Sequence, residues 1–173
     1  KFILFCGPTL PEVSVRQAWE GLDYDLLPPA QQGDVYTACQ HHPTAIGVVD
    51  GYYEKVPAVW HKEILWAMHE GIHVFGAASI GALRAAELDQ FGMEGVGQIY
   101  GQYASGVLED DDEVAVLHGG AADRFVGLSD AMVNIRATLL AAVDKNIITR
   151  GVASALIAQI KKMHYSERSL LHF

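Results

Sequence analysis

The sequence has few cysteines, few basic residues and no long apolar run. Cys6 and Cys39 are too few for a disulfide scaffold and lack the paired spacing of a zinc or iron–sulfur site, which indicates a reducing, cytoplasmic environment. Twelve Lys and Arg face 21 Asp and Glu, and the resulting net charge of -9 argues against nucleic acid as a partner. Because no apolar run approaches the roughly 18 residues that cross a bilayer, no membrane span is predicted.

Sequence motifs for common cofactors are also missing. The glycines near residues 95–101 do not have dinucleotide-binding spacing, and no phosphate loop ending in Gly-Lys-Ser/Thr occurs. The acidic run at residues 109–113 lacks the glycine and spaced oxygens of a calcium loop. Such a run is typical of a solvated turn, and contact with a basic partner surface is its other expected use. We therefore expect no cofactor and no metal site.

Short apolar runs alternate with helical patterns in the first half of the chain. The runs at residues 2–6, 45–49 and 73–78 are β-branched, aromatic or small, which is typical of strands buried on both faces. Helices are predicted at residues 57–70, with the proline in the first turn, and at residues 80–90. This alternation predicts an α/β fold with a mainly parallel sheet flanked by helices.

The second half is predicted to be mostly helical. A further strand is expected at residues 114–118, followed by a helix capped by Ser129 and a helix at about residues 151–164. No repeat or long linker marks a second domain, so residues 1–173 are expected to form one domain. Its core would span about residues 1–128, with C-terminal helices at about 129–165.

Ser79 stands where a buried strand is expected to end and a helix to begin. A serine two residues before Gly81 at such a junction is placed like the serine of a nucleophile elbow, although Ala77 replaces the first glycine of that motif. Ligands of α/β proteins bind at the carboxyl edge of the sheet, and free N–H groups of a first helical turn can hold an oxyanion. The alternative is that Ser79 only caps the helix.

A serine nucleophile needs a base, and the candidates are Lys62, the histidines and the carboxylates of Asp50, Glu63 and Glu87. Lys62 lies early in a predicted helix, where the helix dipole and burial beneath two neighbouring tryptophans would favour the uncharged amine. An exposed helical lysine is the alternative. His61 and Glu63 flank Lys62 on diverging sides of the helix, so we expect only one of the three to face the cleft.

Arg84 has two possible roles. Its long side chain could reach back to the rim of the site and anchor a carboxylate-like group of the substrate, or it could pair with Glu87 three residues later. A generic esterase would instead require a histidine and a carboxylate for Ser79, and His118 is the histidine that this interpretation needs.

Seven segments of the chain form a longer pattern. They are GPTL at 7–10, QGDVY at 32–36, IGVVDG at 46–51, VWHKEIL at 59–65, GAASIGALRAAEL at 76–88, FGM at 91–93 and DDEVA at 111–115. In this order they resemble the TfuA-like family, the companions of YcaO enzymes in peptide-backbone thioamidation. The resemblance runs from about residue 3 to about residue 140.

The resemblance implies a role in sulfur delivery. TfuA proteins are held to hydrolyse the thiocarboxylated C-terminus of a small ThiS-type carrier, and the sulfide is used by a YcaO-type cyclodehydratase or thioamide synthetase that activates the peptide with ATP. The family is credited with a serine–lysine hydrolase pair, whose motifs fall on Ser79 and Lys62. The alternative is a non-catalytic adaptor that bridges YcaO to its peptide or carrier.

Four further residues are expected to support this site. Gly76 and Gly81 would leave room for a slender Gly-Gly tail that ends in the thiocarboxylate. Asp50 and His61 would lie beside the substrate or support the reacting groups.

Overall fold

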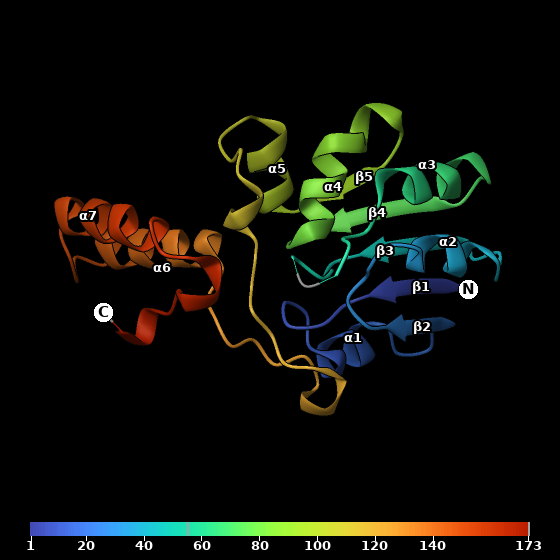
Figure 1. Ribbon diagram of the computed structural model, residues 1–173, viewed down its shortest axis with the longest axis horizontal. Coiled ribbons are helices and arrows are strands. Elements are labelled where there is room, and N and C mark those ends of the chain that lie inside the picture. The colour runs from blue at the N-terminus through green and yellow to red at the C-terminus, as the bar shows by residue number, and fades with distance from the viewer. Residues whose placement is uncertain (55, 173) are drawn as a thin grey trace.

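Five parallel strands form the centre of the structure, a computed structural model that describes residues 1–54 and 56–172 (Figure 1). The strands are β1 (Phe2–Phe5), β2 (Tyr24–Leu27), β3 (Ala45–Val48), β4 (His73–Ala77) and β5 (Glu94–Val96). Their order is β2-β1-β3-β4-β5, and every neighbouring pair is parallel. In this doubly wound order the chain adds β2 on one side of β1 and the later strands on the other side, and the reversal opens a crevice at the carboxyl ends of β1 and β3. The predicted parallel α/β sheet is confirmed.

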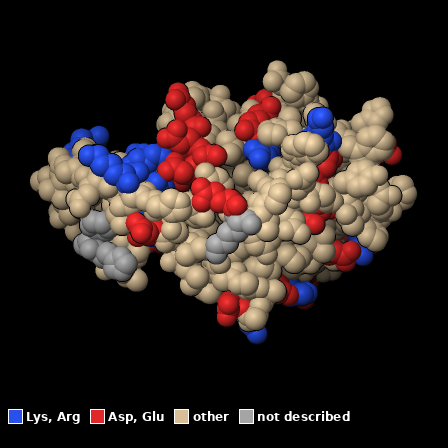
Figure 2. Space-filling view, in the orientation of Figure 1, with Lys and Arg blue, Asp and Glu red and all other residues tan. Residues whose placement is uncertain are grey.

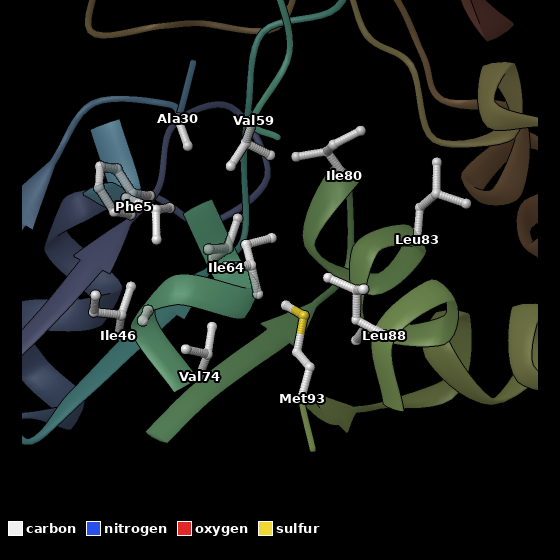
Figure 3. Packing of buried hydrophobic residues seen from close by; sticks show 14 of the residues in the cluster. Phe5, Ala30, Ile46, Val59, Ile64, Val74, Ile80, Leu83, Leu88 and Met93 are labelled. Carbon is white, nitrogen blue, oxygen red and sulfur yellow. The ribbon is translucent and has the colours of Figure 1, made fainter. Parts of the chain in front are cut away.

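Helices cover both faces of the sheet because successive residues of each strand point to opposite sides. In β1, Leu4 packs with Val15 of α1 (Glu12–Ala18) on one face, whereas Phe5 belongs to the larger core on the other. Among the helices that pack on that larger core are α2 (Asp34–Cys39), α3 (His61–His69) and α4 (Ile80–Leu88). Figure 3 shows Ile64 of α3 and Leu88 of α4 within this core.

Helix α3 begins four residues later than predicted. The carbonyl of Pro57 accepts a hydrogen bond from the N–H of Gln32, and Trp60 has extended backbone angles (φ -92°, ψ 140°). Residues 57–60 therefore form an extended approach to the helix, and Pro57 is not in its first turn. The predicted stop is confirmed, because Gly71 follows the helix with a φ of +80°, which glycine adopts readily.

The second half is more helical than the first, but its elements begin differently from the prediction. After α5 (Gln98–Ala104), residues 114–118 do not form the expected strand. The β-pairing found there is a single isolated bridge between His118 and Gly127. Ser129 does not cap a helix, because its Oγ accepts the N–H of Leu117 at 2.8 Å. Helix α6 (Met132–Asp144) begins three residues later and is followed by α7 (Arg150–Lys161).

Helices α6 and α7 pack against each other beyond the carboxyl ends of the strands (Figure 1). Buried apolar residues, including Ile135 of α6 and Ile160 of α7, form a cluster separate from the larger core of the sheet. Within the described part of the chain, no helix has the length and apolar character that a membrane crossing requires.

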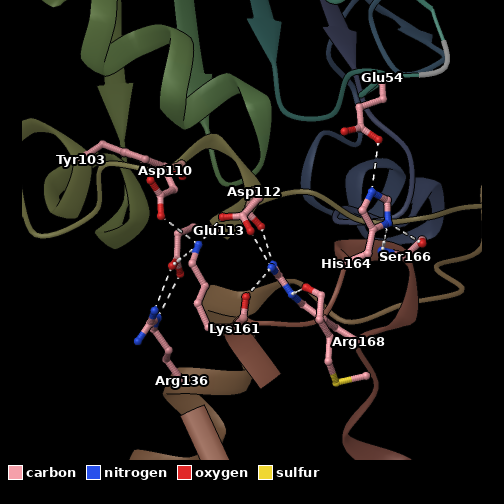
Figure 4. Close-up of polar contacts among 11 residues, drawn as sticks. Glu54, Tyr103, Asp110, Asp112, Glu113, Arg136, Lys161, His164, Ser166 and Arg168 are labelled. Carbon is pink, nitrogen blue, oxygen red and sulfur yellow. Dashed lines mark hydrogen bonds and ion pairs between the residues drawn. The ribbon is translucent and has the colours of Figure 1, made fainter. Parts of the chain in front are cut away.

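The acidic run joins these C-terminal helices to the rest of the molecule (Figure 4). Arg168 is 1% exposed, donates to the carbonyl of Asp112 at 2.8 Å and pairs with the Asp112 carboxylate. Glu113 pairs with Arg136 at 2.9 Å and with Lys161 at 3.0 Å. The expectation of a solvated turn or a surface for a basic partner is therefore wrong for Asp112 and Glu113, which form ion pairs with Lys and Arg side chains of the same chain. Figure 2 shows the acidic side chains beside Lys and Arg side chains.

Pairing also changes the ionisation of the acidic run. Burial alone would raise the pKa of Asp112, but hydrogen bonds and ion pairs with Lys161 and Arg168 lower it. The pKa of Glu113 is likewise lowered by Arg136 and Lys161 against the effect of burial. Both carboxylates therefore stay charged and keep the C-terminal helices attached at neutral pH.

Candidate active site

The predicted junction of strand and helix at Ser79 is confirmed. Strand β4 ends at Ala77 and α4 begins at Ile80, so the chain turns sharply within two residues. Ala78 has a φ of +59°, in the left-handed region that is unfavourable for a residue with a side chain. This turn places Ser79 at the carboxyl edge of the sheet, where doubly wound proteins bind ligands.

Ser79 occupies the position before α4, yet its side chain does not cap the helix. The Oγ donates to the carbonyl of Val114 at 3.3 Å, and among the described residues it accepts no capping hydrogen bond from a backbone N–H of α4. The backbone N–H groups of Ser79 and Ile80 have no acceptor among the residues that the structure describes, whereas the N–H of Gly81 donates to the carbonyl of Val49. Two neighbouring donors are thus available to an oxyanion at this position.

Two hollows meet at Ser79, separated by the segment that begins at Val114. The small hollow is lined by Asp50, Ser79, Ile80, Val114, Ala115 and His118, among others. The large hollow lies toward the start of α6 and is lined by Thr9, Ala78, Ser79, Val114, Ala131 and Asn134, among others. The cavity volume is about 10 Å³ for the small hollow and about 220 Å³ for the large one. Ser79 is therefore reachable from two sides.

Asp50 lies in the crevice between the ends of β1 and β3. Its Oδ2 accepts the N–H of Gly7 at 2.8 Å and that of Thr9 at 3.2 Å, which ties the loop after β1 to the end of β3. Asp50 is 1% exposed, and burial raises its pKa although hydrogen bonds from Thr9 and from nearby backbone N–H groups act in the opposite direction. The structure thus brings Asp50 and Ser79, both expected at the site, to one hollow.

The structure does not bring Lys62 to Ser79. Lys62 is exposed, and its Nζ lies 5.3 Å from the centroid of the Trp60 ring. One turn further along α3, Trp66 contacts Tyr36 of α2, so Lys62 shares the helix face that turns toward α2. Within the described residues Lys62 lines neither hollow. The expected burial of Lys62 is wrong, because a stacked position over an exposed ring leaves the ammonium hydrated, whereas burial would remove its water.

Arg84 and His61 meet on Glu87. The Nη1 of Arg84 lies 2.7 Å from Glu87 Oε2, and the Nε2 of His61 lies 2.8 Å from the same oxygen. Arg84 Nε also donates to the carbonyl of Val59 at 3.0 Å. The ion pair with Glu87, one of the two expectations for Arg84, is what the structure shows. In the described part of the chain neither Arg84 nor His61 lines either of the two hollows at Ser79, and their shared contact with Glu87 links α3 to α4.

Gly76 and Gly81 serve packing rather than substrate binding. A Cβ on Gly81 would lie 1.8 Å from the carbonyl oxygen of Val48, and one on Gly76 would lie 2.1 Å from the carbonyl oxygen of Gly81. These glycines let α4 lie directly on β3 and β4. The expectation that they leave room for a carrier tail is therefore wrong, because protein backbone fills that space.

Glu63 has a structural role that the sequence analysis did not assign. Its buried carboxylate accepts N–H groups at the start of α2, including that of Val35 at 3.0 Å, and the N–H of Trp60 at 2.7 Å. One carboxylate therefore caps two helices, which places a negative charge at two positive helix ends. Its place three residues after Trp60 fits the capping-box pattern, which is the signal that could have revealed the role.

Fold and site together define a doubly wound α/β protein with a candidate serine nucleophile at the carboxyl edge of its sheet. The chain belongs to the TfuA-like family, because the model of that family, described as TfuA-like protein, matches residues 50–169. This confirms the resemblance seen in the sequence and associates the protein with YcaO enzymes and peptide thioamidation. A comparison with curated proteins found no match.

Proposed function

We propose that this protein is a hydrolase that releases sulfide from the C-terminal thiocarboxylate of a ThiS-type carrier for a YcaO partner. One observation carries the proposal: Ser79 lies between two hollows at the carboxyl edge of the sheet, beside two backbone N–H groups that are without acceptors in the described residues. A hydroxyl next to such donors is the arrangement that acyl transfer requires.

In the proposed reaction, Ser79 Oγ attacks the thiocarboxylate carbon and gives up its proton to a base. The N–H groups of Ser79 and Ile80 stabilise the oxyanion of the tetrahedral intermediate. The carbon–sulfur bond then breaks while the base passes the serine proton to the sulfur, hydrosulfide leaves, and the carrier remains bound to Ser79 as an ester. Water hydrolyses this ester and restores the serine.

The large hollow suits a slender substrate. Among its lining residues are Ala78, Gly127 and Ala131, and Asn134 and Thr9 supply polar groups. A Gly-Gly tail has no side chains, so it can enter such a hollow and extend its carbonyl carbon toward Ser79 without displacing packed residues. Selection against bulkier peptide ends follows from the same geometry.

Lys62 stays a proposed proton acceptor for Ser79, and the family resemblance is its main support. Helix α3 begins at the same edge of the sheet as Ser79, and the described residues hold no ion pair for the Lys62 ammonium. To act, the side chain must leave the ring of Trp60 and move toward the start of α4 when the carrier binds.

Lys62→Arg tests this role. We expect turnover to fall about 100-fold or more, because a guanidinium keeps the positive charge but does not accept the serine proton near neutral pH. The measurement is sulfide release at saturating carrier, with Lys145→Arg as a control, since Lys145 is exposed at the end of α6. Turnover by Lys62→Arg at the wild-type rate would remove Lys62 from the mechanism.

An adaptor is the second candidate, and an exposed aromatic group favours it. Tyr36, Trp60 and Trp66 are each about half exposed (50%, 51% and 44%), and Tyr36 and Trp66 are in contact. Exposed aromatic side chains of this kind are enriched in protein interfaces. Docking of a partner at this group is compatible with hydrolysis at Ser79.

The decisive experiment measures sulfide released from a thiocarboxylated carrier by the wild-type protein, with and without a YcaO partner. Catalytic sulfide release, with many turnovers per protein molecule, is the expected result. If carrier and YcaO both bind but no sulfide is released under either condition, the hydrolase proposal fails and the adaptor function takes its place.

A further inference from the structure

Asp50 has a carboxylate oxygen that the fold itself does not use. Oδ2 accepts two backbone N–H groups, whereas the buried Oδ1 has no hydrogen-bond partner within the described residues. A buried polar atom without a partner is costly, and such atoms in folded proteins mark a bound molecule or a chemical role. Asp50 therefore presents one structural oxygen and one oxygen free for a ligand.

The small hollow limits what this ligand can be. It has space for about one water molecule and is lined by Asp50 and Ser79 together with apolar groups such as Ile80, Val114 and Ala115. The carrier tail has its own, larger hollow on the other side of Val114. A single water that donates to Asp50 Oδ1 beside Ser79 matches both the size and the polarity of the small hollow.

We propose that Asp50 is the general base for the second half of the reaction, the hydrolysis of the carrier ester on Ser79. This inference rests on the hydrolase function proposed above. Asp50 Oδ1 accepts one proton from the water while the water oxygen bonds to the ester carbon. The tetrahedral intermediate then collapses, the bond from carbon to Ser79 Oγ breaks, and the proton passes from Asp50 to Oγ. The carrier leaves with an ordinary carboxylate.

The environment of Asp50 agrees with this role. Burial, which raises the pKa of its carboxyl group, makes the carboxylate a stronger base than an exposed aspartate. Other titratable groups face the same hollow, namely Tyr53, Asp111 and His118, and the buried thiol of Cys6 lies near Asp50. Burial raises the pKa of Cys6 to about 11, so the thiol does not compete as a base at neutral pH.

His118 is the principal rival for the same step. Its Nδ1 lies 2.8 Å from the carbonyl of Gly119, which only accepts, so Nδ1 carries the hydrogen and Nε2 is the basic nitrogen. The ring lies between Tyr52 and Phe125, with centroid distances of 5.2 and 6.0 Å. Asp50 is favoured because it has a buried carboxylate oxygen without a partner in the described residues and lines the small hollow together with Ser79.

Asp50→Asn separates the two halves of the reaction. The amide oxygen can still accept the N–H groups of Gly7 and Thr9, but the variant has no base at the position of Oδ1. We expect a burst of one sulfide per protein molecule, followed by steady turnover that is slowed about 100-fold or more. Intact-mass analysis should show the carrier ester on the protein. Hydroxylamine, a stronger nucleophile than water, should release the carrier as its hydroxamate.

Two further variants complete the test. Ala115→Val leaves Asp50 intact but fills the small hollow, and we expect the same burst and the same trapped ester, which keeps the test valid if Asp50→Asn does not fold. Asp34→Asn is the matched control, because Oδ2 of Asp34, the first residue of α2, also accepts a backbone N–H, that of Gln31, and Asp34 lines neither hollow. Its turnover should equal that of the wild type.

The remaining outcomes overturn the proposal in distinguishable ways. Wild-type turnover by Asp50→Asn removes Asp50 as the base and moves the role to His118, while the hydrolase function stands. A folded Asp50→Asn variant that loses the burst as well places Asp50 in the first step, not the second. If the wild type itself releases no sulfide, the proposed function fails, whatever the variants do.

Discussion

Ser79→Ala is expected to reduce sulfide release from a thiocarboxylated carrier about 1,000-fold or more. The variant removes the only proposed covalent nucleophile. The N–H groups at the start of α4 remain, but the oxyanion that they would stabilise is not formed by attack of Ser79. The fold should be unaffected, because within the described residues Ser79 Oγ makes a single long hydrogen bond of 3.3 Å, to Val114, and does not cap the helix.

The comparison needs a serine that has a similar backbone contact away from the site. Ser105 is exposed at the end of α5, where its Oγ donates to the carbonyl of Gly101 at 2.7 Å, so Ser105→Ala serves as the control. Sulfide release by the two variants is measured with both proteins saturated with carrier to the same degree, and their thermal unfolding is measured alongside. Wild-type activity of Ser79→Ala would contradict the nucleophile assignment and require a nucleophile other than Ser79.

The second large effect concerns folding. Gly81→Ala should lower the free energy of unfolding by about 3 kcal/mol or more, because the new methyl group would overlap the backbone carbonyl of Val48. The carbonyl belongs to a central strand, so neither a rotamer change nor a small shift of one side chain relieves the overlap. Helix α4 would have to move off the sheet and take Ser79 with it.

Gly101→Ala provides the opposite result at another helical glycine. Gly101 lies within α5, and a Cβ there would have open space around it. Alanine should stabilise this exposed helix by up to about 1 kcal/mol, because it loses less backbone entropy than glycine on folding. Denaturant unfolding of both variants is the measurement. Equal effects of the two substitutions would show that α4 does not need a glycine at residue 81.

The parts of the fold that the sequence predicts are those with a strong local signal. Strands β1 and β3 are apolar runs that are mostly buried on both faces, whereas β4 is buried on one face only, with His73 exposed and Phe75 and Ala77 half-buried on the other. The turn at Ser79 follows from small residues between a strand and a helix. The edge strand β2 was not predicted, because its residues are all half-buried and include an aspartate. Strand β5 has only three residues and no apolar run.

The candidate site was predictable only in part, for the same reason. Ser79 depends on its immediate neighbours, so the sequence locates it. The exposure of Lys62 depends on how α3 packs beside α2, and the free oxygen of Asp50 depends on Gly7, which is 43 residues away. Contacts between distant segments decide these features, and no short sequence pattern records them.

The pairing of the acidic run with the C-terminal helices also bears on which part of the chain makes up the active site. Glu113, which pairs with Arg136 and Lys161, immediately precedes Val114. The carbonyl of Val114 accepts the hydrogen bond from Ser79 Oγ, and the segment that begins at Val114 separates the two hollows. Ion pairs from the last forty residues thus hold in place the segment that begins at Val114, next to Ser79. This gives a physical reason for a family region that extends past the sheet to residue 169 and includes Arg168. The smallest part of the chain with a complete site therefore includes both the sheet and helices α6 and α7.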